Sequence, residues 1–68
     1  MSEKETVIDQ IIALATDGRP APDERGITVV RNKLNFNEES QLRDMLQIWR
    51  SGPRLSVYDG VVKDLYPV

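Results

Sequence analysis

The sequence predicts a mainly α-helical domain that ends in a small C-terminal β-hairpin. Two stretches, near residues 24–35 and 38–50, place apolar residues at helical spacing on either side of a very short break. Residues 54–66 then carry two short apolar segments around an Asp-Gly dipeptide, which is a typical two-residue hairpin turn. A chain of 68 residues has room for one hydrophobic core, so we expect a single domain over residues 1–68.

The first helix is expected over residues 3–17. Ser2 and Glu5 have the spacing of a capping box, and Gly18 followed by Pro20 favours a stop. Apolar residues that recur at helical spacing line one face of this segment: Val7, Ile8, Ile11, Ile12, Leu14 and Ala15. We interpret this face as part of the core.

The segment after the Pro-containing loop has two interpretations. A helix over 24–35 would begin after Asp23, which is a good N-cap residue. One face of that helix would carry Ile27, Val30 and Leu34. The β-branched residues of the segment would equally suit a strand over 26–36. The capping residue favours the helix.

The third helix is expected over residues 38–50. Asn37 is a suitable N-cap, and Glu38 and Glu39 suit the positive end of the helix dipole. One face of this helix is apolar and carries Leu42, Met45, Leu46 and Trp49. We therefore expect Trp49 in the core. The Ser-Gly-Pro sequence at 51–53 ends the helix.

Helix, short turn, helix and hairpin is the layout of three-helix helix-turn-helix domains of the winged or Cro-like type. In such domains the helix after the turn enters the major groove of DNA. The outward side chains of helix 38–50 are then candidate base contacts, namely Ser40, Gln41, Arg43, Asp44 and Gln47. The candidate phosphate contacts are basic residues, namely Arg31, Lys33, Arg50 and Arg54.

Residues 26–50 also resemble a known family. Eight residues carry this resemblance. Those of its first half are Ile27, Val30, Arg31 and Leu34, and those of its second half are Leu42, Leu46, Trp49 and Arg50. In this order and without a gap, they resemble the N-terminal DNA-binding domain of the KfrA family of plasmid regulators. The resemblance implies a helix-turn-helix fold and a plasmid or phage origin. It favours a small sequence-specific DNA-binding regulator of transcription or replication from a mobile element.

Composition narrows the classes of function. The chain has neither Cys nor His, so we expect no metal site and no His-based catalysis. It is also too small for a typical ligand cleft, and we predict neither an enzyme nor a cofactor. No apolar run approaches the roughly 20 residues of a membrane-spanning helix, and the charged start is unlike a signal peptide. We expect a cytoplasmic protein that does not contact membranes.

The charge balance supports a second hypothesis. Nine basic residues face eleven acidic ones, for a net charge of -2, whereas DNA-binding domains usually carry a basic excess. An acidic phage or plasmid accessory protein would instead bind and inhibit a host protein, such as part of the transcription machinery. Its candidate binding patch is Glu38, Glu39 and Asp44. Double-stranded DNA and a host protein are thus the two predicted partners. A homodimer through the edge of the C-terminal hairpin is a third interaction that the pattern allows.

Overall fold

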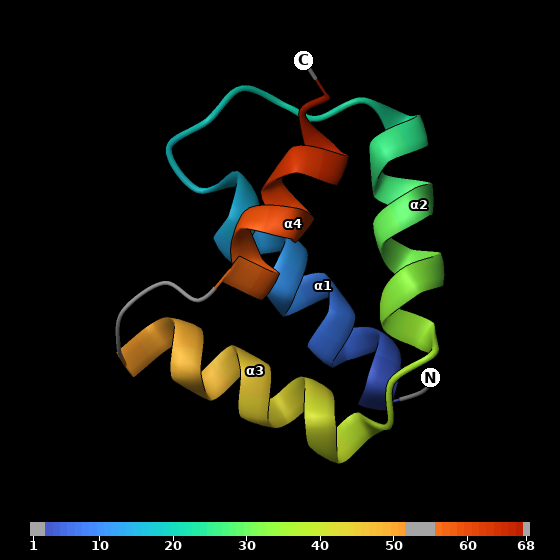
Figure 1. Cartoon of the computed structure of the whole chain (residues 1–68), viewed down its shortest axis with the longest axis vertical. Coiled ribbons are helices and arrows are strands. Elements are labelled where there is room, and N and C mark those ends of the chain that lie inside the picture. Colours follow the sequence, from blue (N-terminus) through green and yellow to red (C-terminus); the bar gives the residue numbers. More distant parts are fainter. Residues whose placement is uncertain (1–2, 52–55, 68) are drawn as a thin grey trace.

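The computed structural model describes residues 3–51 and 56–67, and within these residues the chain forms four helices and no strand. They are α1 (Glu3–Thr16), α2 (Glu24–Asn35), α3 (Glu39–Ser51) and α4 (Ser56–Leu65). α1 runs through the middle of the molecule and contacts all three other helices (Figure 1). α3 packs mainly against α1, and α2 packs mainly against α4.

The first three helices lie close to the predicted ranges. α1 ends at Thr16, and Gly18 follows it with a positive φ of 73°, a conformation that glycine adopts without strain. Ser2, the predicted cap of α1, lies outside the described residues. α2 is a helix and not a strand, and the Asp23 side chain accepts a hydrogen bond from the Arg25 N–H at its start.

α3 begins one residue later than its predicted cap would require. The carbonyl of Glu38 accepts the first helical hydrogen bond, from the Leu42 N–H at 3.1 Å, so Glu38 and not Asn37 is the N-cap. Asn37 instead lies in the turn after α2, where its N–H donates to the Leu34 carbonyl. Leu42 and Leu46 are buried, whereas Met45 and Trp49 are partly buried and pack against the core.

The prediction of a β-hairpin over residues 54–66, and with it the winged or Cro-like class, is wrong. Residues 56–65 form α4 instead, and Asp59 and Gly60 lie inside that helix. Val61 and Leu65 are buried four residues apart, and Val62 and Tyr66 pack beside them, which is a helical spacing. The Asp-Gly pair favours a local turn, but the burial of this apolar face against α2 decides the structure.

Among the residues whose burial is described, ten apolar ones form the core, namely Val7, Ile8, Ile11, Ala15, Val30, Leu34, Leu42, Leu46, Val61 and Leu65. All four helices contribute to it, and α1 contributes the most. Within the described part of the chain, every buried side-chain polar atom has a hydrogen-bond partner. None of the described helices is long and apolar enough to span a membrane.

Gly26 of α2 lies directly against the backbone at the end of α4. A Cβ atom at this position would lie 2.7 Å from the carbonyl oxygen of Asp64 and 2.9 Å from that of Leu65. Both distances are shorter than a van der Waals contact, and both atoms belong to the backbone. Only glycine therefore fits at position 26 without pushing α4 away from α2.

We predict opposite effects for alanine at two glycines. Gly26→Ala should lower the free energy of unfolding by about 1–3 kcal/mol, because the added methyl group overpacks the contact with α4. Gly60→Ala should raise it by about 0.5–1 kcal/mol, because a Cβ there meets no atom within 4 Å and alanine favours a helix. Urea unfolding followed by circular dichroism measures both. A Gly26→Ala variant as stable as the wild type would contradict the close approach of α2 and α4.

Candidate interaction surfaces

The solvent side of α3 forms the first candidate surface. Because Leu42 and Leu46 face the core, the residues on the opposite side are exposed. We call this side the α3 outer face, and it consists of Ser40, Asp44, Gln47, Ile48 and Ser51. Three of the five predicted base contacts are therefore exposed together. Ile48 has 42% of its surface exposed, and it is not among the predicted contact residues. It is the one isoleucine of α3, and it lies outside the apolar stripe.

Gln41, another predicted base contact, has a structural role. Its side-chain oxygen accepts a hydrogen bond of 3.0 Å from the N–H of Glu38, the N-cap residue of α3. A glutamine at the third helical position that reaches back to the N-cap is half of a capping box. The side chain is therefore committed to the start of α3 and does not belong to the α3 outer face.

Arg43, the last predicted base contact, lies on the flank of α3 that faces α1. Its guanidinium is 3.1 Å from a carboxylate oxygen of Glu39 and 3.6 Å from one of Glu3. A shallow hollow of about 460 Å³ between α1 and α3 is lined by Gln10, Arg43, Leu46, Gln47, Arg50 and Ser51. The structure thus brings together two predicted base contacts, Arg43 and Gln47, and one predicted phosphate contact, Arg50.

The other predicted phosphate contacts are separated. Arg31 donates to the carboxylate of Asp9 in α1, and Lys33 lies 2.9 Å from the carboxylate of Asp64 in α4. Residues two apart on a helix point to nearly opposite sides, so these two cations cannot follow one phosphate strand. Arg54 lies outside the described residues.

The predicted acidic patch does not form a single cluster. Glu38 and Asp44 are exposed, but they are six positions apart and point to different sides of the helix. Glu39 is partly buried and pairs with Arg43. Asp44 is therefore the one member of the patch that lies on the α3 outer face.

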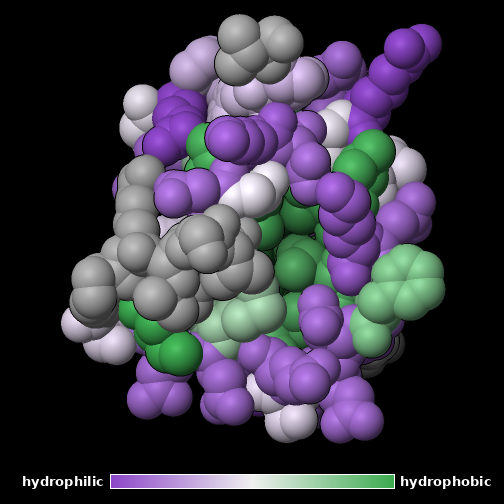
Figure 2. All heavy atoms as spheres, viewed as in Figure 1, coloured by the Kyte–Doolittle hydropathy of each residue, from purple (hydrophilic) through white to green (hydrophobic). Residues whose placement is uncertain are grey.

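The second candidate surface is an apolar depression that sequence reasoning did not find. It has a volume of about 350 Å³ and lies between α2, α3 and α4, and we call it the apolar hollow. Its described lining consists of Lys33, Leu34, Asn37, Met45, Gly60, Val61 and Asp64. Figure 2 shows a hydrophobic area at the centre of this face, surrounded mostly by hydrophilic residues. No sequence signal could reveal it, because its lining residues come from three helices.

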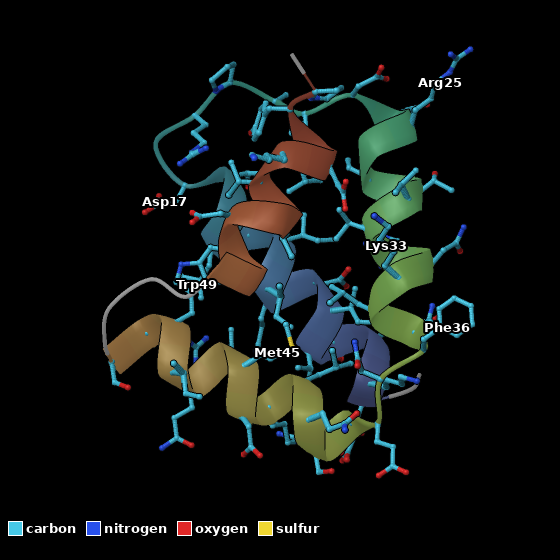
Figure 3. All side chains as sticks on the ribbon, viewed as in Figure 1. Asp17, Arg25, Lys33, Phe36, Met45 and Trp49 are labelled. Atoms are coloured by element: carbon cyan, nitrogen blue, oxygen red, sulfur yellow. The ribbon has the colours of Figure 1, made fainter. Side chains whose placement is uncertain are left out.

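Phe36 is the most exposed large apolar residue beside this hollow. It follows directly on α2, and 90% of its surface is exposed. Figure 3 shows the ring pointing outward from the end of α2, away from Met45 and the centre of the molecule. A partner that covered this ring would gain affinity, because burying a Phe side chain is worth roughly 1.5–3 kcal/mol.

Comparisons with protein families, with curated proteins and with solved structures find no match to this chain. The resemblance to the KfrA family therefore stays a prediction.

The role of Gln41 can be tested by stability. Gln41→Ala should lower the free energy of unfolding by about 0.5–1 kcal/mol, since it leaves the Glu38 N–H without its acceptor. Gln41→Glu should retain most of the stability, because glutamate serves equally at this position of a capping box. Thermal unfolding of the two variants decides the matter. Equal stability of Gln41→Ala and the wild type would argue against the capping role.

Proposed function

We propose that this chain is a small acidic protein-binding module, and that the α3 outer face binds a basic surface on a host protein. The observation that supports it most is the pairing of the chain's own cations. Arg31, Lys33 and Arg43, which were candidate DNA contacts, each contact a carboxylate of the same chain. A net charge of -2 agrees with this choice of partner.

The paired cations disfavour DNA for a geometric reason. A phosphate that approached Arg31 or Lys33 would also approach Asp9 or Asp64, which lie within contact distance of the same nitrogen atoms. The repulsion between the carboxylate and the phosphate offsets the attraction of the cation. Arg31 and Lys33 would therefore contribute little of the counterion release that drives DNA binding.

The α3 outer face has features of a protein-binding surface. It is held on a helix that packs along α1, so its side chains are positioned before a partner arrives. Ile48 gives it an exposed apolar centre, and Asp44 lies one turn earlier on the same side. An apolar contact with a charged neighbour suits a partner whose surface combines an apolar site with basic residues.

A sequence-specific DNA-binding regulator from a plasmid or phage is the second proposal. One observation favours it, because Arg43, Gln47 and Arg50 line the same hollow between α1 and α3. Arginine and glutamine can both read base edges. The two proposals differ in the residues that matter and in their dependence on salt.

The first test measures binding to DNA by fluorescence anisotropy, with duplex from the upstream region and with random duplex. We expect no binding of the wild type near physiological salt. The double variant Asp9→Asn with Asp64→Asn should gain salt-sensitive binding to both duplexes, because it unmasks Arg31 and Lys33.

The control for this test changes the charge equally without unmasking a cation. Glu5→Gln with Asp17→Asn removes two exposed acids that have no ion pair among the described residues. If the control variant gained as much DNA binding as the test variant, net charge alone would explain the gain. Tight wild-type binding to the upstream duplex near physiological salt would favour the DNA-binding regulator instead.

The second test identifies the partner by affinity capture from host lysate with matched baits. Proteins bound through the α3 outer face should be recovered with the wild type and lost, at least about tenfold, with Asp44→Lys or Ile48→Asp. Asp17→Lys makes the same charge exchange at an exposed site beyond the end of α1 and should retain them (Figure 3). Equal recovery with all four baits would exclude the α3 outer face as the binding surface.

A further inference from the structure

We propose that two copies of this chain associate through the face shown in Figure 2, with Phe36 of each copy seated in the apolar hollow of the other. This self-association goes beyond the proposed function, since it uses a different surface and a different partner. It also replaces the predicted homodimer, which required the edge of a hairpin that residues 56–65 do not form.

Phe36 is well placed to act as an anchor. Its backbone N–H bonds to the carbonyls of Lys33 and Leu34, so the backbone of Phe36 is fixed by the end of α2. An aromatic side chain has few rotatable bonds and therefore loses little conformational entropy when it is immobilised. Aromatic residues that enter an apolar pocket commonly supply most of the affinity of an interface.

The apolar hollow has room for such a ring. An engineered cavity of about 150 Å³ lined by apolar residues binds benzene, and the hollow is larger, at about 350 Å³. Leu34, Met45 and Val61 supply apolar contacts, and a methionine sulfur interacts favourably with aromatic rings. Gly60 lines the hollow without a side chain, and a Cβ atom there would meet no atom within 4 Å.

The position of Phe36 favours a second copy as the occupant. Asn37 and Lys33, which line the hollow, are one and three residues from Phe36 in the sequence. The ring points away from its own hollow, so it cannot fill it (Figure 3). The ring and the hollow lie side by side on one surface. A two-fold axis between two copies can therefore place the ring of each copy in the hollow of the other.

The charges around the hollow are compatible with this arrangement. The described part of its lining carries one cation, Lys33, and one anion, Asp64, which lie 2.9 Å apart. Two copies related by a two-fold axis would therefore present opposite charges to each other, with Lys33 of one copy able to reach Asp64 of the other. None of the residues of the α3 outer face lines the hollow.

The size of the contact sets the expected affinity. Two rings and their surroundings bury less than a standard interface, so we expect a weak dimer with a dissociation constant in about the micromolar range. Phe36→Ala should weaken it at least about a hundredfold, because the variant loses both anchors at once. The substitution leaves the core unchanged, since Phe36 is 90% exposed.

The experiment is sedimentation velocity of the full chain over a range of concentrations. The wild type should form a dimer, whereas Phe36→Ala and Gly60→Leu should each stay monomeric. Gly60→Leu keeps the ring but adds a large side chain to the lining of the hollow, which should hinder entry of the ring. Thermal unfolding of each variant confirms that it is folded. An equimolar mixture of the two variants should form a heterodimer, because it retains one ring and one open hollow.

Nuclear magnetic resonance adds a readout of where the ring binds. The methyl signals of Met45 and Val61 should shift with protein concentration in the wild type, through the ring of the second copy, and stay constant in Phe36→Ala. A wild type that stays monomeric would overturn the proposal and leave the hollow to another partner. So would a dimer that Phe36→Ala does not weaken, or a mixture of the variants that does not associate.

Discussion

The contact between Gly26 and the backbone of α4 is the constraint on which most of the structure depends. Without a side chain at Gly26, the end of α4 lies directly on α2, and Leu65 becomes fully buried. The same approach brings Asp64 to Lys33 and lets the Tyr66 hydroxyl donate to the Pro20 carbonyl. The apolar hollow follows from it as well, because α2 and α4 form two of its walls.

Local signals were sufficient for three of the four helices. Asp23 caps α2 as its position in the sequence indicates, and the apolar stripe of α1 is the centre of the core. The hairpin prediction failed because Asp59-Gly60 is a strong turn signal only when no other interaction competes. In this chain Val61 and Leu65 bury a helical face against residues about thirty positions earlier, and no local pattern contains that information.

The same limit applies to the candidate site. The exposure of Ser40, Asp44 and Gln47 could be read from helical spacing alone. The pairing of Arg31 with Asp9, 22 residues away, could not, and neither could the pairing of Lys33 with Asp64. Whether a cation is available to a ligand depends on what the fold places beside it. The sequence therefore identified candidate cations without showing that carboxylates accompany them.

The interhelical ion pairs connect different pairs of helices. Asp9–Arg31 joins α1 to α2, Lys33–Asp64 joins α2 to α4, and Glu3–Arg43 joins α1 to α3. Each is exposed and worth at most about 1 kcal/mol, so apolar burial remains the main source of stability. On the proposed function, these pairs matter more for recognition than for folding. They place carboxylates beside cations of α2 and α3, and so reduce the number of cations available to phosphate.

The two candidate surfaces can operate together because they use different sides of α3. Met45 lines the apolar hollow, whereas Asp44, the preceding residue, belongs to the α3 outer face. A dimer joined at the hollows would present two such faces at a fixed separation. A partner with two matching sites would then bind with higher apparent affinity than either face provides alone. Weak self-association would thereby make binding depend on the concentration of the chain, without a change in its fold.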